Sequence, residues 1–165
     1  MVFNYCPQCG KELVLKEIGD EGLMPYCTPC LKVYFDWIGQ CTITGVINEF
    51  NEIALLRQNG SPVDRWGLVA GHMKKGESLE CSALREVEEE TGQISKEITY
   101  VSSYYYEQKE LLMVGFKCRV NKRAFNVSKE IEEVKWFTLE EADQKIRHGS
   151  IAYQLYDQIR KDINS

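Results

Sequence analysis

The chain beyond residue 36 alternates short apolar runs with polar breaks. Residues 41–47 and 53–58 are rich in β-branched and aliphatic residues and flank a polar turn, which predicts a β-hairpin. Residues 78–91 contain neither Gly nor Pro and end at Gly92, which predicts a helix with a C-terminal glycine. Further strands and helices are expected at 98–107, 111–120, 134–138, 139–147 and 150–163. Because strands and helices do not alternate strictly, the pattern predicts a sandwich with a mixed sheet, of the α+β class.

The composition changes near residue 36, which predicts a small module at 1–36 and a larger domain at 37–165. Two CxxC pairs, Cys6 with Cys9 and Cys27 with Cys30, lie in the small module. Each CxxC turn directs two sulfur atoms at one point, and two such turns complete a tetrahedral site suited to structural Zn²⁺. A catalytic or redox site is the alternative, but four cysteine ligands leave no open coordination position. The module resembles a zinc ribbon.

Charge and hydropathy narrow the class of protein. The 165 residues include 20 Lys and Arg against 25 Asp and Glu, a formal charge of −5, so no basic surface is expected to hold a nucleic acid. No run of about 18 apolar residues occurs, and the first residues lack a secretory signal. The sequence therefore predicts a cytoplasmic protein that binds neither membranes nor nucleic acid.

Acidic residues gather on the helix predicted at 78–91. At about 100° per residue, Glu86, Glu89 and Glu90 share one face, and Glu77 ends the glycine-bounded loop before the helix. A solvated acidic surface is the ordinary interpretation of such a run. Carboxylates at these spacings repel one another, however, and grouped carboxylates suit Mg²⁺ or Mn²⁺ bridged to substrate phosphates.

The loop and helix together resemble the signature of the Nudix hydrolase family, which runs G, five residues, E, seven residues, then REUxEExGU, with U aliphatic. The matching positions are Gly71, Glu77, Arg85, Glu86, Val87, Glu89, Glu90 and Gly92. Only the last position departs, with Gln93 where an aliphatic residue is usual. The resemblance implies an α/β/α sandwich over residues 37–165. It also implies a pyrophosphohydrolase that cleaves a nucleoside diphosphate linked to another moiety.

The resemblance also assigns roles to residues. Glu86 and Glu90 are expected to bind the metal, with Glu89 as either a third ligand or the catalytic base. The Gly71 carbonyl is expected to join the ligands, while Glu77 and Arg85 hold the loop against the helix and reach the metal through water. Lys74 is expected to face phosphate, although a loop lysine is more often simply solvated.

A zinc ribbon before such a domain is similar to the NADH pyrophosphatase group. In that group a late glutamate contributes to metal binding or water activation, which makes Glu130 a second candidate base. The group's specificity motif SQPWPFPxS should begin at Ser103, but residues 103–111 contain no proline and keep only the first serine. Tyr106 replaces the motif's tryptophan and would stack on adenine or lie half-buried in the core. The substrate thus stays open among the NADH, ADP-ribose and FAD types.

Two further expectations concern function and assembly. Some Nudix-like domains bind nucleotides as sensors or regulators and typically lose carboxylates from the signature, whereas this chain keeps all of them and is therefore predicted to be an enzyme. A homodimer is expected because the family's site is often completed across two chains, and because the hairpin at 41–58 would offer an apolar surface.

Overall fold

The computed structural model describes residues 3–95 and 97–164. It divides into two compact units, Met1–Ile38 and Gly39–Ser165, so that the boundary follows the one expected from composition by two residues.

The smaller unit is a three-stranded antiparallel sheet. Its elements are β1 Val14–Glu17, η1 Gly19–Glu21, β2 Leu23–Cys27 and β3 Lys32–Val33, with β2 in the centre. Of its described residues only Cys6 and Cys27 are buried, while apolar side chains such as Leu15 are exposed. So little burial cannot stabilise a unit of this size, which is the situation in which a bound metal supplies the folding energy.

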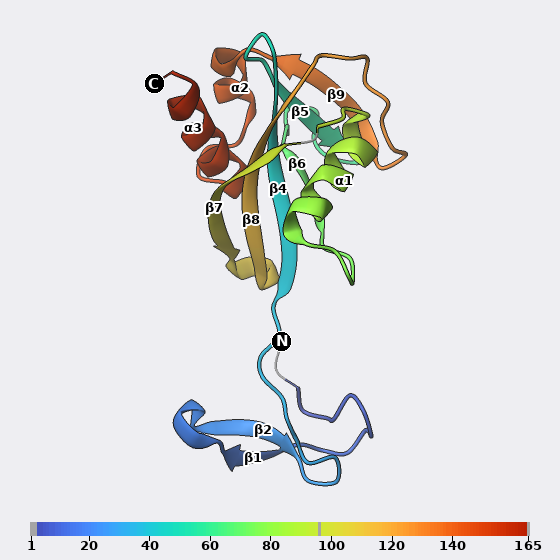
Figure 1. The fold of residues 1–165 in the computed structure, drawn as a ribbon, viewed down its shortest axis with the longest axis vertical. Coiled ribbons are helices and arrows are strands. Elements are labelled where there is room, and N and C mark those ends of the chain that lie inside the picture. The colour runs from blue at the N-terminus through green and yellow to red at the C-terminus, as the bar shows by residue number, and fades with distance from the viewer. Residues whose placement is uncertain (1–2, 96, 165) are drawn as a thin grey trace. The chain divides into compact units, whose positions relative to one another are not determined.

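The larger unit is built on a six-stranded mixed sheet (Figure 1). Its strands are β4 Gly39–Asn48, β5 Ile53–Gln58, β6 Val69–His72, β7 Ile98–Tyr106, β8 Leu111–Val120 and β9 Ile131–Phe137. They lie in the order β7-β8-β4-β5-β9, and β6 pairs with β4. The β4–β8 pairing is parallel and the other pairings are antiparallel. The predicted hairpin is confirmed as β4 and β5, whereas the last strand begins three residues before its predicted start.

Helices cover both faces of this sheet (Figure 1). The helix α1 Leu79–Thr91 packs on β4 and β6, while α3 Ile151–Ile163 packs against β7, β4 and β8, and α2 Leu139–Lys145 contacts β5 and β9. The short helix η2 Glu107–Lys109 joins β7 to β8. The α/β/α sandwich with a mixed sheet is confirmed. Within the described residues, no helix is long and apolar enough to cross a membrane.

Local sequence sets both ends of α1. The Ser78 side chain accepts a hydrogen bond from the Cys81 amide at the start of the helix. At its end Gly92 adopts a left-handed conformation with φ of 70°, which costs a residue without a side chain little. Ala83 and Val87 are fully buried against the sheet. The helix is thereby held with its carboxylate-bearing face beside β6.

The hairpin is buried within the unit. Residues 41–48 and 53–57 are all buried, because helices cover the hairpin on both faces. The expectation that this hairpin offers an apolar surface to a second copy is therefore wrong. A sequence pattern shows that a strand is apolar, but not which element of the same chain covers it.

Gln93 shows how the fold accommodates a polar residue at an aliphatic position. The side chain is fully buried, yet its amide donates to the Arg123 and Ala124 carbonyls at 3.1 and 3.4 Å and accepts from the Arg123 amide at 3.2 Å. It thus ties the end of α1 to the segment after β8. A buried polar group satisfied in this way is stable, whereas one that loses its partners is costly.

Replacing Gln93 by Leu is expected to destabilise the larger unit by about 2 kcal/mol, because the backbone groups that it satisfies lose their partners. Urea unfolding measures this difference. The exposed Gln144 on α2 provides the control, since Gln144→Leu should change stability by less than about 0.5 kcal/mol. Equal midpoints for the two variants would contradict the account.

Candidate active site

The site lies where the strand β6 and the helix α1 approach each other closely. Gly71 and His72 belong to β6 and not to the loop, so the loop after the strand is shorter than the sequence indicates. The Glu86 carboxylate lies where a side chain on Gly71 would stand. Only glycine at this position allows the backbone of β6 to meet the carboxylate of α1.

Replacing Gly71 by Ala is expected to displace the Glu86 carboxylate and to lower kcat/KM by about 10²-fold, the cost of misplacing a catalytic group by about 1 Å. The matched control is Gly67→Ala, because a side chain at Gly67 meets nothing within 4 Å. Steady-state kinetics of both variants measure the effect. Unchanged activity in the Gly71 variant would show that the close approach is not required.

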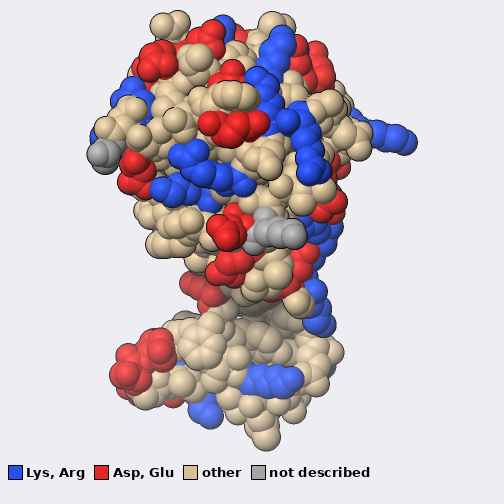
Figure 2. All heavy atoms as spheres, turned by 45° about the horizontal axis from the view of Figure 1, so that its top comes forward, with Lys and Arg blue, Asp and Glu red and all other residues tan. Residues whose placement is uncertain are grey.

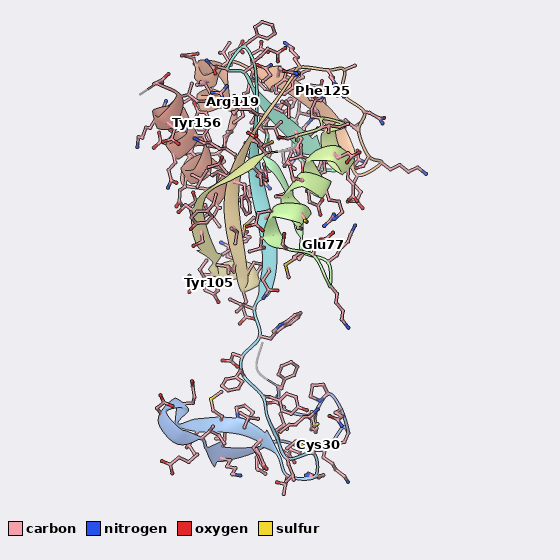
Figure 3. The ribbon with its side chains drawn as sticks, in the orientation of Figure 1. Cys30, Glu77, Tyr105, Arg119, Phe125 and Tyr156 are labelled. Carbon is pink, nitrogen blue, oxygen red and sulfur yellow. The ribbon has the colours of Figure 1, made fainter. Side chains whose placement is uncertain are left out.

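Arg85 ties the loop to the helix. Its Nε donates to Glu77 Oε1 at 2.6 Å and its Nη2 to Glu77 Oε2 at 3.0 Å, so that the loop carboxylate receives a two-point contact. This guanidinium lowers the pKa of Glu77 to about 2. Nη1 contacts Glu86 at 2.6 Å and Glu89 at 3.0 Å, and Nη2 donates to the His72 carbonyl at 3.1 Å. Arg85 therefore holds the loop, the end of β6 and the helix in one arrangement. Figure 3 labels Glu77 at the helix end of that loop.

Glu90 is the most buried carboxylate of the group. Its side chain turns toward β6, where Oε2 accepts a hydrogen bond from the Ala70 amide at 3.2 Å, and the residue is only 7% exposed. Burial, together with the nearby charges of Glu86, Glu130 and Glu89, raises its pKa to about 8, although the hydrogen bond from the Ala70 amide acts in the opposite direction. A carboxylate held among like charges in this way is stabilised in its ionised form by a divalent cation.

A cavity of about 360 Å³ opens beside these carboxylates. Its lining residues come from every strand near the site and are Cys41, Gln58, Ala70, Gly71, His72, Glu86, Glu90, Tyr106, Lys109, Leu111, Met113 and Glu130. The structure thus brings together Gly71, Glu86, Glu90 and Glu130, which are far apart in the sequence. Three glutamates and a strand glycine that line one cavity offer the oxygen ligands that Mg²⁺ or Mn²⁺ prefers.

Two expected site residues lie elsewhere. Neither Glu89 nor Lys74 lines this cavity. The Lys74 ammonium instead lies 3.4 Å from the Glu89 carboxylate, whose side chain is 49% exposed. The expectation that Lys74 faces substrate phosphate is therefore not supported by its position. Glu89 serves as a partner of Arg85 and Lys74 in this structure.

The sequence did not indicate every residue of the cavity. Lys109 follows β7 in η2, and Gln58 ends β5, yet both line the cavity with the carboxylates. Lys109 falls where the specificity motif has its third proline, so the motif gave no role for it. Cys41 is buried and also lines the cavity. The available signal was that Gln58 ends a strand and that Lys109 lies in the connection between two strands.

The cysteine cluster of the smaller unit has the geometry of a metal site. All four sulfur atoms, of Cys6, Cys9, Cys27 and Cys30, lie within 4.8 Å of one another. Cys6 Sγ is 3.9 Å from Cys30 Sγ, and Cys9 Sγ is 3.5 Å from Cys27 Sγ. With Zn–S bonds of about 2.3 Å, a tetrahedral site requires sulfur atoms about 3.8 Å apart. The grouping of the four thiols is therefore compatible with structural Zn²⁺; Figure 3 labels Cys30 in this cluster.

The larger unit is an α/β/α sandwich with a mixed sheet. Its helix α1 carries grouped carboxylates beside the strand that contains Gly71, an arrangement typical of proteins that bind a metal ion together with phosphate. A family profile for the NUDIX domain matches residues 41–159. The chain belongs to the Nudix family.

A curated relative is similar in sequence over nearly the whole chain. A protein of Vibrio parahaemolyticus named NAD-capped RNA hydrolase NudC is 30% identical over 163 residues, which cover 98% of this chain. The chain spans 61% of that relative's length. The relative's name assigns to it a substrate that contains RNA, which conflicts with the expectation that nucleic acid is excluded as a partner here.

Solved structures share the fold. A Nudix hydrolase of Nitrosomonas europaea superposes with a TM-score of 0.67 at 24% identity, covering 98% of this chain and 91% of that one. The NUDIX domain of Shewanella oneidensis NrtR, complexed with ADP ribose, gives a TM-score of 0.68 at 19% identity and covers 84% of this chain and 94% of that domain. At these identities the likeness establishes the fold alone.

Proposed function

We propose that this chain is a Mg²⁺- or Mn²⁺-dependent hydrolase that cleaves the pyrophosphate linkage of a nucleoside diphosphate joined to another moiety, of the NADH, ADP-ribose or FAD type. The observation that carries the proposal is the meeting of Glu86, Glu90 and Glu130 at one cavity beside Gly71. An acidic surface without this function would have no reason to bury Glu90 among other carboxylates.

The residues fall into two groups by their contacts. Glu86, Glu90 and the Gly71 carbonyl would hold the divalent ion, which when bound neutralises charge on the phosphoryl oxygens and lowers the pKa of water. Glu77 and Arg85 position these ligands, because Arg85 contacts both Glu77 and Glu86 while neither Arg85 nor Glu77 lines the cavity. Arg85 is therefore a positioning residue in this proposal.

Glu130 is our choice for the base. Glu130 lines the cavity, whereas Glu89 does not line it and contacts Arg85 and Lys74. The Glu130 backbone is fixed, since its carbonyl accepts from the Asn59 amide at 3.0 Å and the Asn59 side chain donates to the Lys129 carbonyl at 2.5 Å. A carboxylate on so anchored a segment can take a proton from water that attacks phosphorus.

Tyr106 and Lys109 are the proposed substrate contacts of this cavity. Tyr106 lines it from the end of β7, and its hydroxyl lies 3.1 Å from Gln108 Oε1, which fixes the ring. Such a ring can stack on a base. Lys109 lines the same cavity and supplies a positive charge that the loop residue Lys74 does not, and it would contact a phosphate.

The smaller unit is proposed to bind one structural Zn²⁺ through Cys6, Cys9, Cys27 and Cys30. Since zinc binding requires reduced thiolates, we also propose a reducing compartment, the cytoplasm.

We propose a homodimer for two reasons, which are the exposed edge of the sheet and the resemblance to a family whose site is often completed across two chains. β7 is an edge strand, and its Tyr100 is 58% exposed, so a second copy can pair there. Light scattering at micromolar concentration should give twice the chain mass. A monomeric mass would contradict this part of the proposal.

A substrate panel with product identification tests the function. Purified protein with Mg²⁺ is incubated with NADH, ADP-ribose, FAD, diadenosine polyphosphates and nucleoside triphosphates. We expect cleavage of at least one of the first three into two monophosphates. Tight nucleotide binding without turnover on the whole panel would instead identify a sensor or regulator.

A further inference from the structure

A connection without regular structure carries the proposed base. Residues 121–130 join β8 to β9 without a helix or strand (Figure 1), and Glu130 is the last residue before β9. Glu130 is exposed, yet it lines the carboxylate cavity, and its charge helps to raise the pKa of Glu90. A side chain on such a connection keeps one position only where other parts of the chain hold the connection in place. The contacts around Glu130 therefore decide whether it can serve as a base.

A β-bulge holds the strand that follows Glu130. The pairing of β5 with β9 shifts directly after Arg57, so that Glu132 has no pairing partner in β5. The buried Arg57 guanidinium lies 3.2 Å from the Glu132 carboxylate and 3.1 Å from the Glu133 carboxylate, and so holds the bulged residue and its neighbour. Bulges often lie beside active sites, where they change the direction of a side chain.

The bulge changes the face of the sheet on which the start of β9 lies. Ile131 and Val134 belong to one buried cluster together with Val87 of α1. Side chains three positions apart on a regular strand point to opposite faces, so the extra residue of the bulge is what brings Ile131 to the α1 face. Because Glu130 is joined directly to Ile131, its strand side is fixed, and its remaining freedom lies in the segment that precedes it.

Asn59 holds that preceding segment. Its backbone amide donates to the Glu130 carbonyl at 3.0 Å, and its side-chain amide donates to the Lys129 carbonyl at 2.5 Å. Asn59 itself lies in the turn after β5, in which the Ser61 amide donates to the Gln58 carbonyl at 3.0 Å. Gln58 lines the same cavity as Glu130. One turn of the chain thus joins a wall of the cavity to the residue proposed as the base.

We propose that Asn59 is a positioning residue for hydrolysis, and that its side-chain amide fixes the direction from which Glu130 meets the attacking water. The inference rests on the proposed function, in which Glu130 is the base. Ser128 also contacts this segment, because its hydroxyl accepts from the Glu130 amide at 3.4 Å, but that bond stays within the connection. Asn59 instead joins the connection to a strand of the sheet. Misplacing a catalytic group by about 1 Å costs about 10²-fold in rate, which sets the scale of the expected effect.

A purely structural role of Asn59 is the alternative, and it predicts different behaviour. Asn59 is exposed and its φ is not positive, so alanine fits its backbone and the fold should persist without the side chain. A structural role would act on stability and would not depend on which residue stands at position 130. A positioning role acts through the Glu130 carboxylate, so its effect should vanish when that carboxylate is absent.

The test is a double-mutant cycle of Asn59→Ala and Glu130→Gln in the full chain with Mg²⁺, on the substrate of the panel that is cleaved fastest. Asn59→Ala alone should lower kcat about 10- to 100-fold and change KM less than about threefold, because Asn59 does not line the cavity. In the Glu130→Gln background the same substitution should lower kcat less than about threefold. The melting temperature of Asn59→Ala should stay within about 2 °C of the wild-type value.

Asn121→Ala is the matched control, since Asn121 is an exposed residue of the same connection and lines a different cavity. It should keep the wild-type kcat. Among the described residues on the face drawn in Figure 2, Lys and Arg side chains are interspersed with Asp and Glu side chains, so a variant that altered a charge would also act on its neighbours. Asn59→Ala and Asn121→Ala leave every charge unchanged.

The inference is overturned if Glu130→Gln lowers kcat while Asn59→Ala does not, or if Asn59→Ala lowers kcat by the same factor in both backgrounds. Either result would leave the proposed function intact. A wild-type rate in Glu130→Gln would overturn both the inference and the assignment of the base. Failure of the proposed function as a whole would instead appear as no turnover of any substrate by the wild-type chain.

Discussion

Replacing Glu86 or Glu90 by Gln is expected to lower the rate of pyrophosphate hydrolysis by about 10²- to 10⁴-fold. Both carboxylates line the cavity, and Glu90 is buried beside Ala70, so each substitution removes a charge that nothing nearby can replace. The amide is nearly isosteric with the carboxylate, and the fold should therefore persist. Steady-state rates at saturating Mg²⁺, with circular dichroism as a check of folding, measure the effect.

Neighbouring glutamates on the same helix provide the controls. Glu88 is exposed and does not line the cavity, so Glu88→Gln should stay within a few-fold of the parent. Glu89→Gln should cost less than Glu130→Gln, since only Glu130 lines the cavity. Equal activity in the Glu86 and Glu88 variants would show that the acidic face of the helix is only a solvated surface. A larger loss at Glu89 than at Glu130 would move the role of base to Glu89.

Removing zinc is expected to unfold the smaller unit while the larger unit keeps its structure. The four cysteine sulfur atoms lie close enough together to bind one ion, and of this unit's described residues only Cys6 and Cys27 are buried. Structural Zn²⁺ binds with an apparent free energy of about 10–16 kcal/mol, which far exceeds what so small a core can supply. Hydrogen exchange of the full chain should show complete loss of protection at β2 Leu23–Cys27 after chelation and little change at β4.

Metal analysis gives the complementary result. The reduced, folded protein should contain about one zinc per chain, and Cys27→Ser should contain much less. Cys81→Ser is the control, because Cys81 is exposed on α1 and far from the cluster in sequence. Protection of β2 that survives both chelation and Cys27→Ser would show that the unit folds without metal.

The sequence predicted the parts of the site that depend on local spacing. The helix with Glu86 and Glu90, its Ser78 and Gly92 ends and the grouping of cysteines follow from short-range patterns, and the structure has them. Helical spacing also placed Glu89 on the same face, but it could not show that Arg85 and Lys74 would draw this side chain away from the cavity. Competition among partners is a property of the folded state.

Long-range features of the site could not be predicted from local patterns. Lys109 reaches the cavity because β7 and β8 pair in a register that brings η2 to its mouth. Gly71 was expected in the loop before the helix, but pairing with β4 holds Gly71 and His72 in β6 although glycine has low strand propensity. Each of these depends on tertiary contacts.

The most direct test of the central claim is hydrolysis of ADP-ribose by the wild-type chain with and without divalent ions. The carboxylate site predicts AMP and ribose 5-phosphate as products in the presence of Mg²⁺ or Mn²⁺, loss of turnover with EDTA and recovery when Mg²⁺ is added back, with no recovery in Glu86→Gln. Turnover that persists in EDTA, or in Glu86→Gln at the wild-type rate, would contradict a hydrolytic site built on these carboxylates.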